Sequence, residues 1–260
     1  MAEAGAGDSL LGRQDLHVHT TMSDGYVPLE ELVRIGAERG VQIGVADHVS
    51  RRNLKRFVNG DERIRRYLDA LEAQDVFVSG EFCWCDDYYL DLPDDVMRRF
   101  DYLVGSNHGF PLPGGGMASP WWQQLPPEWK ARPQELMDVM VDELCRMVRT
   151  MPIQIAAHST LTPPALFDVD GDVDAWWTAE REDRYVEALA ESGVALEISN
   201  RYRLPHDRLL GKALQAGVRF SLGSDGHGRD QVARLEWAAG TARRVGVTDA
   251  DLFVPERRRR

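Results

Sequence analysis

Short apolar runs alternate along the chain with longer segments in which apolar residues recur every three or four positions. The longer segments have the spacing of amphipathic helices, most clearly at residues 27–40, 133–148 and 206–217. Strands that alternate with helices favour parallel pairing, either in an α/β barrel or in an open doubly wound sheet. The short runs predict seven strands, within residues 14–19, 41–48, 76–82, 102–108, 153–158, 194–200 and 218–227.

The segment 27–40 carries the clearest helical signal. Pro28 suits the first turn of a helix, and Gly40 suits its C-terminal stop. Apolar residues at helical spacing predict one buried face, formed by Leu29, Leu32, Val33 and Gly36.

The ends of the predicted strands distinguish the two architectures. In a barrel the C-terminal strand ends converge on one mouth, whereas distant strand ends of an open sheet stay apart. Nearly every strand-like run here ends in a side chain that can bind a metal. The sequence therefore favours an α/β barrel, with seven strands instead of the usual eight. The side chains in question are His19, His48, Glu81, His108, His158 and Asp225.

Six of the seven histidines fall at these strand ends. A single histidine in such a place is usually a packed or surface residue, but six placed alike, together with three carboxylates, are hard to explain by packing. Polar groups at a barrel mouth cost free energy unless they are paired or coordinated. We therefore expect a metal site. Its candidate ligands are His17, His19, Asp24, His48, Glu81, His108, His158, Asp225 and His227.

The size of this ligand set suggests more than one ion. A zinc-like ion uses about three or four protein ligands, so nine side chains fit two or three divalent ions. Imidazole and carboxylate donors suit Mn, Fe or Zn. Cys83 and Cys85 share strand parity with Glu81, which leaves a thiolate near the metals as one interpretation. Two small buried strand residues are the favoured interpretation.

Composition limits the partners and the location. No apolar run is long enough to span a membrane and the start lacks a signal-peptide pattern, so we expect a cytoplasmic protein. A net charge of −11 argues against binding to long nucleic acid. Small anionic substrates remain compatible, because bound cations can invert the local field. We expect one barrel domain at 13–255, with a flexible tail at 1–12 and a basic tail at 256–260.

The stretches "DLHVHTTMSDG", "ADH", "GEF", "GSNH", "AHS" and "GSDGH" occur in this order between Asp15 and His227. Each is weak alone, but together they resemble the polymerase and histidinol phosphatase (PHP) superfamily, over nearly the whole chain. The resemblance implies a distorted (β/α)7 barrel with a trinuclear metal centre at its C-terminal strand ends. Two departures, Asn107 before His108 and Gly226 before His227, remove no ligand.

The resemblance also implies how the ligands are shared among the ions. Glu81 would bridge the first two ions. The implied sets are His17, His19, Glu81 and Asp225 for the first ion, Glu81, His108 and His158 for the second, and Asp24, His48 and His227 for the third.

The chemistry expected of such a centre is hydrolysis of a phosphate ester. A metal-bridging hydroxide would attack a small phosphomonoester, with Glu81, Asp225 and His227 as the catalytic residues. Histidinol phosphate is the nearest family substrate. Nucleotides, nucleoside 3′,5′-bisphosphates and short oligonucleotides are the alternative. Amidohydrolase-type cleavage of C–N bonds or lactones is disfavoured, because no lysine stands at a strand end to form a bridging carbamate.

Phosphate oxygens that are not bound to metal usually meet arginine or lysine. The candidates to contact substrate follow two strand ends; they are Arg51, Arg52, Asn200, Arg201 and Arg203, with Lys55 as a weaker one. The Gly- and Pro-rich segment 109–129 carries Trp121 and Trp122. It is either a lid over the mouth or a loop anchored by its aromatic residues.

Overall fold

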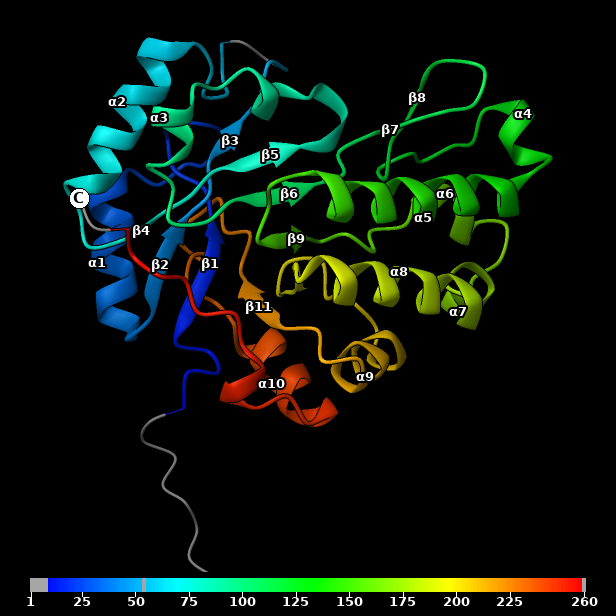
Figure 1. The fold of residues 1–260 in the computed structure, drawn as a ribbon. Coiled ribbons are helices and arrows are strands. Elements are labelled where there is room, and N and C mark those ends of the chain that lie inside the picture. The colour runs from blue at the N-terminus through cyan, green and yellow to red at the C-terminus, as the bar shows by residue number, and fades with distance from the viewer. Residues whose placement is uncertain (1–8, 53–54, 259–260) are drawn as a thin grey trace, which may run out of the picture.

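A computed structural model describes residues 9–52 and 55–258 of the chain. All seven predicted runs contain a strand, and a small hairpin is added in the loop after residue 108 (Figure 1). The strands are β1 (Gln14–Val18), β2 (Gln42–Val45), β3 (His48–Val49), β4 (Phe77–Val78), β5 (Glu81–Cys83), β6 (Val104–Ser106), β7 (Phe110–Pro111), β8 (Met117–Ala118), β9 (Ile155–Ala157), β10 (Ala195–Ser199) and β11 (Phe220–Gly223).

The strands form two parallel sheets, with the orders β1-β2-β4 and β11-β10-β9-β6-β5-β3. Two of the predicted runs contribute a strand to each sheet: β2 continues into β3, and β4 into β5. Tyr67 accounts for the interruption, because its hydroxyl lies between the Asp47 nitrogen and the Ser79 carbonyl, where a direct backbone hydrogen bond would continue the ladder. It accepts a hydrogen bond from Asp47 N at 3.3 Å and donates one to the Ser79 carbonyl at 2.7 Å. The two runs therefore stay side by side although their ladders are broken.

The first and last strands of the fold meet at their C-terminal ends. Val18 forms a parallel bridge with Gly226, and His19 N donates to the Gly226 carbonyl at 3.0 Å. These pairings show a mixed α/β fold with parallel sheets. They do not by themselves establish the predicted closed barrel, which stays a prediction.

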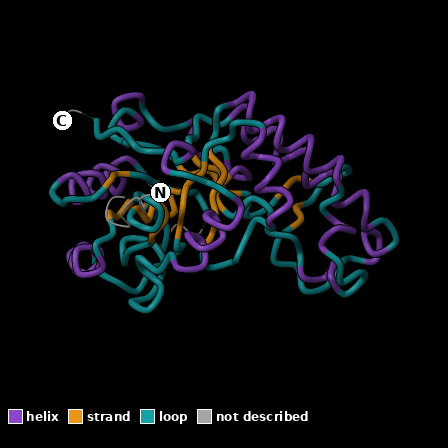
Figure 2. The backbone as a smooth tube through the Cα atoms, turned by 90° about the horizontal axis from the view of Figure 1, so that it is seen from below, coloured by secondary structure: helices purple, strands orange, loops and turns teal. Residues whose placement is uncertain are grey.

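Helices surround the strands on several sides (Figures 1 and 2). In Figure 1, α1 and α2 lie on one side of the strands, α5, α8 and α9 on the other, and α10 below. The longer helices are α1 (Leu29–Arg39), α2 (Asp61–Glu72), α5 (Pro133–Thr150), α8 (Ala179–Ser192), α9 (Asp207–Gln215) and α10 (Glu236–Val245). Short helical turns lie in the loops: α3 (Asp94–Met97), α4 (Pro127–Lys130), α6 (Pro164–Phe167), α7 (Val173–Trp176), η1 (Trp84–Asp86), η2 (Tyr88–Leu90) and η3 (Asp249–Asp251).

Helix α1 follows its sequence pattern with one change. Gly40 caps its C-terminal end in the left-handed region, at φ 64°, which a glycine adopts without steric cost. On the buried face, Ile35 is buried where Val33 was expected, and Val33 is only half-buried. Ile35 therefore completes the buried face of α1 that packs against β2.

The described parts of both predicted tails are held by the domain. At the N-terminal side, Ser9 donates to Asp249 at 2.9 Å and Leu11 is buried. At the C-terminal side, Arg258 N donates to Asp101 at 2.8 Å. Ser9 and Leu11 therefore contact the domain, and residues 1–8 lie outside the described part, so the predicted tail bounds stay a prediction.

Across residues 9–52 and 55–258, no helix combines the length and the apolar character needed to cross a bilayer.

Gly44 on β2 lies against a buried tyrosine, and this close approach leads to a stability prediction. A Cβ at residue 44 would overlap the Tyr102 hydroxyl, which donates to the Leu16 carbonyl at 2.7 Å. We expect Gly44→Ala to lower the free energy of unfolding by about 1–3 kcal/mol, because overpacking displaces the ring. The matched control is Gly211→Ala, where a Cβ in α9 meets nothing within 4 Å; its stability should rise by about 0.5–1 kcal/mol. Urea denaturation of both variants tests this, and equal shifts would contradict it.

Candidate metal centre

The parallel strands and the residues that follow them bring the nine predicted metal ligands together. His48 and Glu81 are register partners on the neighbouring strands β3 and β5. The remaining ligands come from β1 or from the residues that directly follow β1, β6, β9 and β11. They are His17, His19, Asp24, His108, His158, Asp225 and His227.

Glu81 lies at the middle of this group. Its side chain is buried, and its two oxygens face histidines from four different strand ends. Burying a carboxylate costs free energy unless it is paired or coordinated, and here imidazoles surround it. The nitrogens within 3.7 Å of its oxygens are His48 Nδ1 at 2.7 Å, His108 Nε2 at 3.1 Å, His158 Nε2 at 3.2 Å, and Nε2 of His17 and His19 at 3.7 Å.

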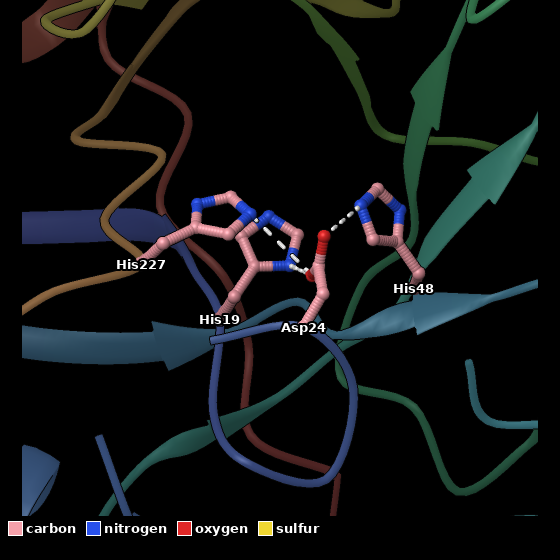
Figure 3. Close-up of side chains that lie close together, drawn as sticks. All are labelled: His19, Asp24, His48 and His227. Carbon is pink, nitrogen blue, oxygen red and sulfur yellow. Dashed lines mark ion pairs between the residues drawn. The ribbon is translucent and has the colours of Figure 1, made fainter. Parts of the chain in front are cut away.

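A second cluster forms around Asp24, in the turn after β1 (Figure 3). Its carboxylate points at three imidazoles that come from β1, β3 and the segment after β11. Figure 3 shows Asp24 between His48 on one side and the His19 and His227 rings on the other. The distances are 3.5 Å to His19 Nδ1, 3.5 Å to His48 Nε2 and 3.4 Å to His227 Nε2.

The donor atoms are spaced so that one cation could contact several of them. Within each of four groups, the ligand atoms lie within 4.8 Å of one another. His19 Nδ1 is buried yet makes no hydrogen bond, and Glu81 Oε2 makes only ion-pair contacts with imidazoles, the nearest at 2.7 Å to His48 Nδ1. Buried polar atoms without a hydrogen bond need another partner, and imidazole and carboxylate together suit Zn and similar divalent ions. The groups are His19, Asp24, His48 and His227; His17, Glu81 and His158; His17, His19 and Asp225; and His48, Glu81 and His108.

The predicted ligand sets compare with this geometry as follows. Asp24, His48 and His227 lie together, with His19 as an additional neighbour. His108 and His158 both approach the same oxygen of Glu81. The structure therefore brings all nine predicted side chains to one place, while their sharing among ions stays a prediction.

The pKa values of Glu81 and its neighbouring histidines show that the ionised carboxylate attracts positive charge. Burial opposes the ionised form of Glu81, but the imidazoles of His48 and His108 outweigh it and hold its pKa well below the ordinary value. Burial likewise opposes the charge on His48, and Glu81 overcomes it, so the pKa of His48 rises to about 10. His108 responds in the same way, and its pKa rises to about 9.

Glu197 is a buried carboxylate that sequence reasoning missed. It lies on β10, where Oε1 accepts a hydrogen bond from His17 Nδ1 at 2.7 Å and Oε2 accepts one from His158 N at 2.7 Å. A carboxylate bound to the far nitrogen of a ligand histidine orients the ring and sets its tautomer. Gly223 leaves room for it, because a Cβ there would overlap Glu197 Oε1. The available signal was an acid within the apolar run "VALEIS".

Two further buried carboxylates support the loops that carry ligands. Asp15 accepts hydrogen bonds from Ser224 N at 2.8 Å and from Ala233 N at 2.9 Å, beside the ligand Asp225. Asp47 accepts from Thr20 N at 2.7 Å and from the Thr20 hydroxyl at 2.6 Å, in the turn that leads to Asp24. Burial raises the pKa of both aspartates to about 6.

Two of the predicted arginines reach the cavity above these ligands. The cavity has a volume of about 330 Å³, and Arg52 and Arg201 line it. Nη1 of Arg201 lies 2.6 Å from His227 Nδ1 and 3.4 Å from Asp225 Oδ1. Both guanidinium groups are thus placed to meet an anion beside the ligand cluster.

The other predicted substrate residues lie elsewhere. Arg51 turns outward, where it pairs with Asp91 and stacks over Tyr88. Asn200 Oδ1 accepts hydrogen bonds from the backbone nitrogens of residues 237 and 238 and so caps the start of α10. Arg203 occupies a left-handed turn at φ 56° and does not line the cavity. Lys55 is exposed and does not line it either.

The Trp-rich loop divides its aromatic residues between two roles. Trp121 lines the cavity, and its ring centroid lies 5.4 Å from that of His108. Trp122 packs against the core, and Trp129 in α4 is buried. Part of the loop is therefore anchored while Trp121 faces the site; a lid movement stays a prediction.

Comparisons with known proteins give the family and the fold of this chain. A model of the PHP domain matches residues 15–201, most of the chain. The chain belongs to the PHP domain family. A search of curated protein sequences finds no significant match.

Two solved structures share the fold of this PHP domain protein. One is a candidate histidinol phosphatase, hisK, from Listeria monocytogenes, with a TM-score of 0.67 and 15% identity over 85% of this chain and 97% of the other. The other is histidinol phosphate phosphatase from Lactococcus lactis subsp. lactis Il1403, complexed with Zn, L-histidinol and phosphate. Its TM-score is 0.64, with 17% identity over 90% of this chain and 94% of the other.

The contact between Glu197 and two ligand histidines predicts an effect on metal affinity. Glu197→Gln keeps the shape but removes the charge that orients His17, so Zn affinity should fall by about 10–100-fold. Glu191→Gln is the matched control, because Glu191 is an exposed glutamate on α8 that pairs with Arg149. Titration with Zn against a competing chelator measures both variants. Wild-type affinity in Glu197→Gln would show that this carboxylate does not support the ligands.

Proposed function

We propose that this PHP domain protein is a metal-dependent phosphatase that hydrolyses a small phosphomonoester. The observation that carries the proposal is the buried carboxylate of Glu81, which is surrounded by imidazoles from four strand ends and lines a cavity with two arginines. Structural ion-pair networks seldom gather so many histidines, whereas metal sites use this donor set.

The proposed framework is a distorted barrel of seven parallel runs, which forms one domain over residues 13–255. Two observations support this closure. β2 continues into β3 and β4 into β5, which links the two sheets, and Val18 forms a bridge with Gly226. In such a barrel the metal ligands lie at the C-terminal mouth, as active sites of barrel enzymes do.

The residues present fit two or three divalent ions of Mn, Fe or Zn. The proposed sets are those implied by the family resemblance, with Glu81 shared between two of them. Ions held there would neutralise charge on phosphate oxygens and lower the pKa of a water molecule. Glu81, Asp225 and His227 line the cavity, so their side chains would face the reacting phosphate.

The arginines would bind the phosphate oxygens that the ions do not. A guanidinium group presents a planar fork that matches two oxygens of a phosphate. Arg201 approaches Asp225 and His227 from one side of the cavity, and Arg52 lines it too. These two side chains would orient the ester and offset the negative charge that grows on it.

The remaining walls favour a substrate that carries a ring. Phe57, Trp121 and Tyr202 line the cavity, which at about 330 Å³ lies at the small end of ligand sites. Histidinol phosphate, with its imidazole ring, is our preferred substrate. The Lactococcus lactis relative, complexed with L-histidinol and phosphate, supports this choice. Nucleotides and nucleoside 3′,5′-bisphosphates also carry rings and are the second candidates.

A panel of phosphomonoesters tests the function and separates the substrates. The protein is assayed with added Mn or Zn and after removal of metal by a chelator. We expect release of phosphate that requires metal, fastest from histidinol phosphate. A preference for 3′-phosphates or nucleotides would select the second candidate, and metal-independent or absent release would contradict the proposal.

Arg201 and Arg203 offer a matched pair, because only Arg201 lines the cavity. Arg201→Ala should lower kcat/KM by about 10–100-fold, since a charged hydrogen bond to phosphate is lost. Arg203→Ala should stay close to wild type. Steady-state kinetics, with metal content measured on the same samples, checks the pair. Equal losses in both variants would remove Arg201 from the phosphate site.

The pKa values of the ligand histidines give the pH dependence a definite sign. The pKa values of His48 and His108 are raised to about 10 and 9, so both bind protons tightly when no metal ion is bound. Metal ions must displace these protons, so a fall in pH weakens metal binding. We expect activity to be lost on acidification and the midpoint to move to lower pH with excess metal. A midpoint independent of metal concentration would contradict this competition.

A further inference from the structure

Two cysteines stand side by side at the wall of the cavity. Cys83 is the last residue of β5, two residues after Glu81, and it lines the cavity. Cys85 follows in the turn η1, and both are free thiols. Their Sγ atoms lie 2.7 Å apart. The C-W-C stretch, read from the sequence as two small buried strand residues, is therefore a close pair of thiols.

The chain geometry is suited to a bond between these sulfurs. A disulfide joins its sulfur atoms at about 2.04 Å, so the pair needs to close by roughly 0.7 Å. The turn of η1 brings residue 85 back toward residue 83, and Cys85 is only half-buried, which allows a small oxidant to reach it. The third cysteine, Cys145, lies in α5, where its thiol contacts the Arg184 carbonyl at 3.6 Å.

The thiol pair is connected to the ligand cluster. Cys83 and His108 line the same cavity, and His108 Nε2 lies 3.1 Å from Glu81. Cys83 also shares strand β5 with Glu81. A covalent bond at Cys83 would move the cavity wall beside His108 and pull on the strand that presents Glu81.

We propose that Cys83 and Cys85 form a reversible disulfide that switches off the adjacent site, with hydrogen peroxide as the oxidant. One thiol sulfur attacks a peroxide oxygen, the O–O bond breaks, and a sulfenic acid and one water form. The second sulfur attacks the sulfenic sulfur and releases the other water, so two thiols and one peroxide yield one disulfide and two waters. A dithiol reductant restores both thiols. Only the effect on activity rests on the proposed function.

Thiol counting and mass spectrometry test the disulfide directly. The full-length protein is treated with equimolar peroxide, denatured, and its free thiols are counted. We expect wild type to fall from three free thiols to one, the chain to lose the mass of two hydrogens, and peptide mapping to link residues 83 and 85. Three remaining thiols, a link to Cys145, or a link between two chains would overturn the proposal.

Two variants make the test specific. Cys145→Ser should still lose two thiols, whereas Cys85→Ser should keep its thiol count or gain oxygen without losing two hydrogens. Phosphate release, measured on the same samples, should fall at least tenfold on oxidation of wild type and return with dithiothreitol, but stay unchanged in Cys85→Ser. A disulfide without loss of activity overturns the switch. Absent activity in the reduced protein overturns the proposed function instead, while the thiol count still reports the disulfide.

Discussion

A buried negative charge determines the organisation of this molecule. Glu81 is removed from water in the interior, at a cost that only close positive partners can offset. Five imidazoles from four strand ends approach its two oxygens, and those of His48 and His108 have raised pKa values because of this carboxylate. Such an arrangement favours the binding of divalent ions, because each imidazole can exchange a proton for a metal bond. The parallel strands bring these distant residues to one point.

Three further buried carboxylates hold the predicted metal ligands and their loops in place. Glu197 binds His17 and the backbone of His158, so one side chain orients ligands from two strands. Asp15 and Asp47 perform the equivalent task for loops, since each accepts hydrogen bonds from backbone nitrogens near a ligand. The chain therefore buries several acids around one site. Their burial costs folding free energy, but it positions the predicted ligands and the substrate.

The sequence predicted the strands, and the structure brings the nine candidate ligands together, because both follow local periodicity: a strand-like run ends where a histidine or an acid begins. Their role as metal ligands stays a prediction. Contacts made by turns were harder to predict. Asn200 and Arg51 follow strand ends as Arg201 and Arg52 do, yet the chain turns them toward α10 and Asp91. Glu197 was missed because its partners, His17 and His158, are distant in the sequence, and the apolar run around it gives no sign of them. The same holds for the approach of Cys85 to Cys83, which depends on the turn η1.

The central claim, that Glu81 gathers metal ions, is tested most directly by counting metal in the purified protein. Wild type and Glu81→Gln are prepared with added Zn or Mn, desalted, and analysed for bound metal, with circular dichroism to confirm the fold. We predict about two or three ions per chain in wild type and loss of most of them in a folded Glu81→Gln. A metal-free wild type, or equal metal content in both, would contradict the account.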